Sequence, residues 1–194
     1  MLTHNCPCAA FEDMPPYGTP EHEAIDWAYT HQPIPITTGM NDTAFGVGKT
    51  LTRGQAATFL YAAAGRPEFD ESTAAKTFSD VPEGKYYTKA VLWAASDGLV
   101  DGYSDGTFKP NNTLTRAQIL TILYAQAGKP AVDEYTNPYS DVRTGNWYYA
   151  PAVWAYSAGI EKGADGKFAQ ATLCTREAFV LYLYRVMEGK ALAE

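Results

Sequence analysis

Residues 78–124 read FSDVPEGKYYTKAVLWAASDGLVDGYSDGTFKPNNTLTRAQILTILY, and this stretch carries the pattern that decides the fold. Its first half has apolar side chains at the i, i+3, i+4, i+7 and i+8 spacing of one helix face, namely Tyr87, Ala90, Val91, Ala94 and Ala95. Gly98 follows, where a glycine can end a helix with a positive φ. The stretch therefore predicts a helix that ends near residue 98.

A second helix is predicted from the segment Thr115-Arg116-Ala117-Gln118. Thr at the N-cap and Gln three residues later form a capping box, in which each side chain accepts a hydrogen bond from a backbone N–H that the helix leaves unsatisfied. The same box recurs at Thr52-Arg53-Gly54-Gln55, whereas Thr175-Arg176-Glu177-Ala178 keeps only the Thr cap. Between the two predicted helices, residues 101–106 have the Gly and Asp content of a tight turn.

The whole helix-loop-helix unit recurs along the chain. Phe78-Ser79-Asp80-Val81 returns as Tyr139-Ser140-Asp141-Val142, and the match continues through the next predicted helix after one deletion. A degenerate copy lies upstream, with Phe11 and Asp13 at the positions of Phe78 and Asp80. Such self-similarity indicates repeated supersecondary units. We therefore predict a mainly α protein of three helix-loop-helix repeats, at residues 9–68 (degenerate), 76–130 and 137–190, packed into one compact unit.

Composition and charge exclude several classes of function. The 194 residues are 46% hydrophobic and 19% charged, which is typical of a globular chain. The net charge is −7, from 15 basic and 22 acidic residues, so nucleic acid and anionic membrane surfaces are not expected as partners. No apolar stretch approaches the roughly 18 residues of a membrane span, and residues 1–4 do not begin a secretory signal pattern.

The sequence predicts neither a metal site nor a catalytic site. Cys6-Pro7-Cys8 is too closely spaced for a two-residue zinc knuckle, and Cys174 stands alone, so no metal and no cofactor are expected. Residues 102–106 (GYSDG) have the letters of a hydrolase nucleophile elbow, but all the His residues lie upstream and the 137–190 copy lacks the Ser. We interpret this segment as a turn.

The repeated motifs together resemble those of the S-layer homology family. The shared elements are F-x-D-V, an aromatic-Tyr pair, A-V-x-W-A, G-x-x-D-G-x-F-x-P and L-T-R-A-Q, which are nearly complete in residues 76–130. The resemblance implies a non-enzymatic anchoring module in which three repeats form a pseudo-threefold spindle around a central three-helix bundle. It also implies a location outside the cell, in the cell wall or S-layer.

The resemblance further implies that grooves between neighbouring repeats bind secondary cell-wall polysaccharide, often carrying pyruvate ketals, with a peptidoglycan-linked glycan as a related partner. The positions that match the family's groove residues are Arg53, Arg116, Arg176, Asp13, Asp80, Asp141, Tyr86, Trp147, Gly102 and Gly163. A guanidinium matches a carboxylate bidentately, and a helix N-terminus favours an anion. An aromatic ring suits the C–H face of a sugar, and a carboxylate accepts hydroxyl protons.

Other interpretations of these residues stay open. Each Arg after a Thr cap could be solvated or paired with an Asp, the Asp residues could form turns, and Trp27, Trp93 and Trp154 are expected in the core. The repeats could instead dock a protein, self-assemble into a surface layer, or form a non-catalytic appendage of an extracellular enzyme. Because the first copy departs most from the pattern, with residues 15–21 (PPYGTPE) where the aromatic pair should stand, we expect binding to be lost first in grooves built mainly from this copy.

The pairing of the cysteines also stays open. Cys174 occupies the place of Leu51 and Leu114, so it is expected as a small apolar residue in a half-buried loop. If the first copy contacts the third, Cys6 or Cys8 could reach Cys174 in a disulfide, but the favoured expectation is that no bridge forms.

Overall fold

The computed structural model describes residues 7–133 and 136–189. The elements in these ranges are α1 (Pro20–Thr30), α2 (Arg53–Ala63), the 3₁₀ turn η1 (Glu71–Thr73), α3 (Thr88–Ser96), α4 (Arg116–Gln126), α5 (Tyr149–Ser157) and α6 (Arg176–Glu188). Extended residues in the described ranges form isolated bridges and no strand. The predicted mainly α class is confirmed. None of the described helices is both long and apolar enough to cross a membrane.

Helices α2, α4 and α6 begin where their caps predict. The Thr52 side chain accepts from the Gln55 N–H while the Gln55 side chain accepts from the Thr52 N–H, and Thr115 and Gln118 form the same box. At α6 the Thr175 side chain accepts from the backbone of the third helical residue without a reciprocal bond, because that residue is an alanine. These local signals are sufficient to position the start of all three helices.

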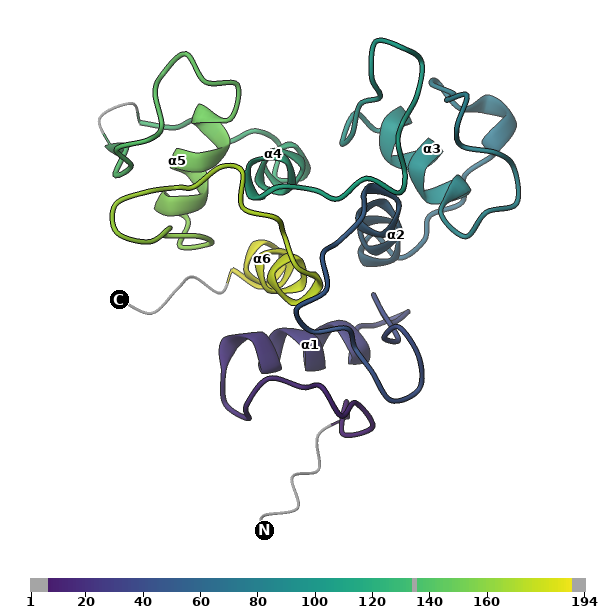
Figure 1. Ribbon diagram of the computed structural model, residues 1–194. Helices are drawn as coiled ribbons and strands as arrows, with labels where there is room; N and C mark the ends of the chain where they lie inside the picture. The colour runs from purple at the N-terminus through teal and green to yellow at the C-terminus, as the bar shows by residue number, and fades with distance from the viewer. Residues whose placement is uncertain (1–6, 134–135, 190–194) are drawn as a thin grey trace.

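The helices are arranged as an inner and an outer set. In Figure 1, α2, α4 and α6 are seen nearly end-on at the centre, with α1, α3 and α5 outside them. The outer helices pack on the inner ones in pairs: α3 on α2, α5 on α4 and α1 on α6. The tightest packing therefore joins helices of different predicted repeats. The division of the chain into three repeats with the bounds given above stays a prediction.

The segments that precede the inner helices meet in a closed set of backbone hydrogen bonds, which we call the backbone ring. The Leu51 N–H donates to Cys174 O (2.9 Å), the Cys174 N–H donates to Leu114 O (2.9 Å), and the Leu114 N–H donates to Leu51 O (3.1 Å). All three side chains are buried. The ring therefore ties together, inside the core, three segments that lie far apart in the sequence.

Cys174 is more deeply buried than its position in the sequence predicts. Its side chain belongs to the core, with 3% of the residue exposed, and is not in a half-buried loop. Burial raises the pKa of the Cys174 thiol to about 12, so the thiol is neutral. Neither Cys174 nor Cys8 is in a disulfide, and Cys6 lies outside the described residues.

The three tryptophans expected in the core differ in burial, and one of them marks the contact between α1 and α6. Trp154 is buried, whereas Trp27 and Trp93 are half-buried and pack against the core. Trp27 of α1 lies against α6, where its ring centre is 5.3 Å from that of Tyr184 and its Nε1 donates to Glu188 (3.0 Å). Helix α1, near the start of the described residues, is therefore in contact with α6, near their end.

Candidate functional site

Each of the three predicted Asp residues holds a loop by its backbone. At 2.7–2.9 Å their carboxylate oxygens accept from consecutive N–H groups: Asp13 from Phe45, Gly46 and Val47; Asp80 from Phe108 and Lys109; Asp141 from Phe168 and Ala169. Burial acts to raise the pKa of Asp13 and Asp141, but the N–H groups more than offset it, so both pKa values lie below the ordinary aspartate value. The carboxylates therefore fix the loops, and a contact with glycan stays a prediction for them.

The three predicted Arg residues reach the same loops from the first residue of an inner helix. Each donates to the carbonyl of the Phe whose N–H is held by an Asp: Arg176 Nε to Phe45 O (2.9 Å), Arg53 Nε to Phe108 O (2.7 Å), and Arg116 Nη1 to Phe168 O. Every Arg thus shares a Phe with one Asp, and the two come from different predicted repeats. The sequence indicates the residue types but not this pairing.

A groove beside Arg176, which we call the first groove, brings two of the predicted residues, Arg176 and Tyr86, together. Its lining includes Arg176, Tyr86, Arg66, Gln55 and Thr58. Tyr86 is 66% exposed, although it is a large aromatic residue. Arg176 is buried, and its guanidinium carbon lies 5.1 Å from the centre of the Phe59 ring. Burial lowers the pKa of Arg176, opposed by the neighbouring Tyr86 and Asp13, but arginine stays protonated in proteins.

A second groove, beside Arg53, has a matching lining. It includes Arg53, Trp147, Lys129, Gln118 and Thr121. Trp147 is 63% exposed, much like Tyr86 in the first groove. Arg53 Nη2 donates to Asp101 O (2.6 Å), and its guanidinium carbon lies 4.3 Å from the centre of the Phe108 ring. By repeat position, the Gln, Thr, basic and aromatic residues of the two grooves correspond one to one.

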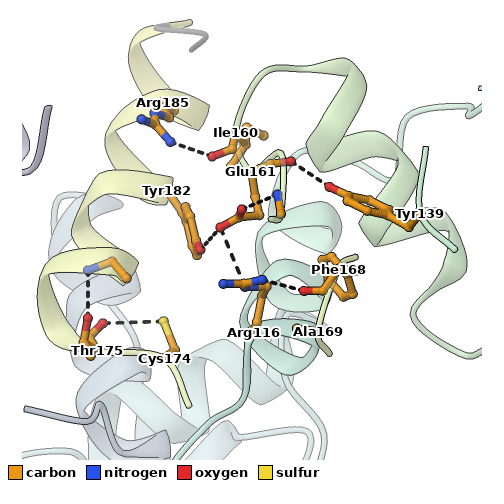
Figure 2. Close-up of polar contacts among 12 residues, drawn as sticks. Arg116, Tyr139, Ile160, Glu161, Phe168, Ala169, Cys174, Thr175, Tyr182 and Arg185 are labelled. Carbon is orange, nitrogen blue, oxygen red and sulfur yellow. Dashed lines mark hydrogen bonds and ion pairs between the residues drawn. The ribbon is translucent and has the colours of Figure 1, made fainter. Parts of the chain in front are cut away.

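Arg116 has different surroundings, shown in Figure 2. A carboxylate oxygen of Glu161 lies 3.7 Å from Arg116 Nε, and the Tyr182 hydroxyl donates to the same oxygen. The other carboxylate oxygen accepts from the Gly163 N–H (2.6 Å), and the Glu161 carbonyl accepts from the Tyr139 hydroxyl (2.9 Å). Burial, reinforced by the Glu161 charge, raises the pKa of Tyr139 and Tyr182, so both phenols are neutral donors. Glu161 thus supplies a carboxylate to Arg116 from within the chain.

The other lining positions are also altered around Arg116. Where the first and second grooves have Gln, Thr and a basic residue, the corresponding residues are Ala178, Leu181 and Gly189. In the place of Tyr86 and Trp147 stands Pro20, on the helix that packs against α6. These substitutions replace the amide, the hydroxyl, the second positive charge and the aromatic ring at those positions. Most of these altered positions belong to the third copy, whereas Gln55, Thr58 and Arg66 of the first groove belong to the first copy. The expectation that grooves built mainly from the first copy have lost binding therefore does not account for the Arg116 site, and it stays a prediction.

Gly102 and Gly163 are required by the packing of their own loops. A Cβ atom on Gly102 would lie 2.3 Å from the Phe78 ring, and one on Gly163 would lie 2.2 Å from Lys167 O. Gly163 also has a φ of +67°, which disfavours other residues. Close backbone approach therefore accounts for both glycines, and a direct role in glycan binding stays a prediction.

Comparison with known proteins bears directly on these sites. The family model of the S-layer homology domain matches residues 77–120, which include Asp80, Tyr86, Gly102 and Arg116. Residues 77–120 therefore belong to the S-layer homology family. Relatives of this S-layer homology chain include Cell surface glycoprotein 1 of Acetivibrio thermocellus, 29% identical over 160 residues, and Amylopullulanase of Thermoanaerobacterium thermosulfurigenes, 35% identical over 115 residues. Another is Cellulosome-anchoring protein of Acetivibrio thermocellus, 30% identical over 118 residues.

The matched regions are a small part of each relative. They cover 77%, 58% and 58% of this S-layer homology chain, but only 7%, 6% and 23% of Cell surface glycoprotein 1, Amylopullulanase and Cellulosome-anchoring protein. The relative named as an enzyme therefore matches over a minor segment of its length. The comparison supports a shared module and does not carry over the activity of the longer proteins.

Several groove residues of this S-layer homology chain were not predicted from the motifs. Glu161 stands where the 77–120 unit has Val100, so an acidic side chain at an apolar repeat position was the available signal. Arg66 and Lys129 follow the glycine after an inner helix and have φ values of +51° and +54°. They lie beyond the quoted motifs, and only the correspondence of the two linings identifies them.

Proposed function

We propose that this chain is a non-covalent anchoring module that binds an anionic cell-wall glycan in the first and second grooves. The observation that carries the proposal is the pairing, in each groove, of a fixed guanidinium with a largely exposed aromatic ring: Arg176 with Tyr86, and Arg53 with Trp147. A sugar that bears a carboxylate offers a charged group for the guanidinium and an apolar C–H face for the ring. Arg66 and Lys129 add a second positive charge to the two grooves.

Family membership supports the coarser part of this function. S-layer homology domains are non-catalytic anchoring modules that bind cell-wall components, and the relatives include proteins named for the cell surface and for cellulosome anchoring. The location predicted for this chain, the cell wall or S-layer, is confirmed by the family and by these relatives. The finer proposal is that the ligand is a secondary cell-wall polysaccharide with pyruvate ketals, because a ketal places a carboxylate on the sugar.

We do not include the Arg116 site among the proposed binding grooves. Its guanidinium is already paired with Glu161, and the aromatic and second basic positions of the other grooves are replaced there. An incoming carboxylate would have to displace a carboxylate that is tethered to the chain and held by Tyr182 and Gly163. The proposed module therefore has two open grooves and one that is closed from within.

The test is co-sedimentation of the chain with purified cell walls, before and after their non-peptidoglycan polymer is stripped. We expect binding to intact walls and its loss after stripping. Binding that survives on stripped walls, or that requires a wall-associated protein, would overturn the proposal and favour protein docking or a peptidoglycan ligand.

Variants connect this binding to the two grooves. Tyr86→Ala and Trp147→Ala should each weaken wall binding, and the double variant should lose about 10-fold or more, because stacked aromatic contacts contribute about 1 kcal/mol each beyond buried area. Tyr17→Ala is the matched control, since Tyr17 is 67% exposed and lines neither groove. Wall binding of the double variant at full strength would contradict the assignment of the grooves.

A further inference from the structure

We propose that Cys8, His22 and Asp26 form a site for a zinc ion that fastens the segment before α1 to that helix. One ligand atom from each residue lies within 4.8 Å of the others, and this is the only such set of His, Cys and acidic residues in the described ranges. Thiolate, imidazole and carboxylate are the ligands that zinc takes in proteins. Calcium and magnesium take oxygen ligands, so the thiol disfavours them. The inference is independent of the proposed glycan binding.

Two of the ligands come from one face of a helix. His22 and Asp26 are four residues apart on α1, which places their side chains side by side. His22 Nε2 lies 3.6 Å from Asp26 Oδ2. Two ligand atoms bound to one tetrahedral zinc at its usual bond lengths are about 3.3–3.6 Å apart. The pair is therefore already spaced as two ligands of a single ion.

The orientation of the His22 ring also fits a metal ligand. His22 Nδ1 lies 2.9 Å from the carbonyl oxygen of Pro15. Because a carbonyl can only accept, this contact places a ring proton on Nδ1, so in the neutral ring the lone pair is on Nε2, the nitrogen 3.6 Å from Asp26 Oδ2. A backbone carbonyl is one of the partners that hold the remote ring nitrogen of a zinc-bound histidine.

Cys8 brings the third ligand from the preceding segment. Its side chain is fully buried, and a turn in which the Phe11 N–H donates to Cys8 O (3.0 Å) brings it to α1. The sequence predicts no metal because Cys6 and Cys8 are too close together to act as a pair. In the structure Cys8 instead meets two residues of a helix that lies well beyond it in the sequence.

A Cys–His–Asp set can also serve as a catalytic nucleophile, but the geometry here does not support that use. A general base needs one ring nitrogen for the thiol and the other for the orienting acid. In this site Nδ1 contacts the Pro15 carbonyl and Nε2 faces Asp26. A buried thiol such as that of Cys8 is also out of reach of a substrate. A metal site uses the same three groups without these requirements.

Cobalt and zinc titrations of the metal-free full chain test the proposal. We expect one Co²⁺ per chain, with a thiolate-to-cobalt charge-transfer band and the intense visible bands of tetrahedral cobalt, and displacement of the cobalt by one equivalent of Zn²⁺. Zn²⁺ should also raise the melting temperature, because it binds the folded state. Cys8→Ser should abolish the charge-transfer band, and His22→Gln and Asp26→Asn should each weaken zinc binding at least 10-fold.

Cys174→Ala is the matched control, because it removes the other buried thiol from the backbone ring and should leave the cobalt spectrum and stoichiometry unchanged. Circular dichroism checks that each variant is folded. The proposal is overturned if the full chain gives no charge-transfer band, if the band persists in Cys8→Ser, or if folded His22→Gln binds zinc as tightly as the unsubstituted chain.

Discussion

At the scale of single residues, Glu161 distinguishes the surroundings of Arg116 from those of Arg53 and Arg176. It pairs with a guanidinium and accepts from Tyr182 and Gly163 in a half-buried cluster. We expect Glu161→Gln to lower the free energy of unfolding by about 1–3 kcal/mol, because Arg116 keeps its charge but loses the charged partner. Urea denaturation of the variant and of the exposed control Glu83→Gln measures the difference.

Glu161→Gln also tests whether the loss of stability is accompanied by a change in wall binding. Because Ala178, Leu181 and Gly189 still stand where the open grooves have Gln, Thr and a basic residue, Glu161→Gln should not create a third binding groove. Wall binding should therefore match that of the unsubstituted chain. A clear gain in binding would show that Glu161 alone closes the site, and an unchanged unfolding curve would argue against the ion pair.

Asp13 and Asp141 are expected to make the stability of the folded chain depend on pH in the acid range. Both have a pKa in the folded chain below the ordinary aspartate value. Their contribution to stability is therefore complete above the unfolded pKa of about 3.9 and is lost as the pH falls through the lower folded pKa. We expect denaturation midpoints to fall as the pH is lowered from about 5 towards 2. Asp13→Asn and Asp141→Asn should flatten this slope, whereas the exposed control Glu12→Gln should not.

At the scale of the elements, the inner helices depend on their threonine caps. Thr52→Ala and Thr115→Ala should each lower the free energy of unfolding by about 0.5–2 kcal/mol, because a backbone N–H at the helix start loses its acceptor. Thermal denaturation followed by circular dichroism measures this loss. The exposed Thr144→Ala serves as the control, and a loss there equal to that at the caps would contradict the capping argument.

These caps also show how much of the molecule could be predicted from sequence. The starts of α2, α4 and α6 follow from signals within four residues, so local chemistry is enough to find them. Which residue each Arg contacts could not be predicted in this way. Arg176 donates to Phe45, which lies far from it in the sequence and is brought to it only by the folding of the chain. The same holds for Glu161, whose carboxylate meets Tyr182 only in the folded chain. Motif positions therefore predicted residue types but not which of these residues contact one another in the folded chain.

At the scale of the whole molecule, each outer helix depends on an inner helix to bury its apolar face. A chain ending at Pro130 would lack α5 and α6, which leaves α4 and α1 without their packing partners and removes Cys174 from the backbone ring. We expect this chain to lose cooperative thermal unfolding, because each unit is stabilised by its neighbours. A chain ending at Gly189 keeps all the described helices and should unfold like the full chain. A sharp transition of the shorter chain near the full-length melting temperature would contradict this interdependence.

The packing of α1 on α6 also means that the two partners of one interface are synthesised far apart in time. About 150 residues separate these helices, and a ribosome that adds 5–20 residues per second needs roughly 7–30 s to make them. During that time the apolar face of α1, including Ile25 and Ala28, has no α6 to cover it. Hence α1 is covered only after the intervening helices and α6 have been translated, and a nascent chain stalled before α6 would expose this face to chaperones and proteases.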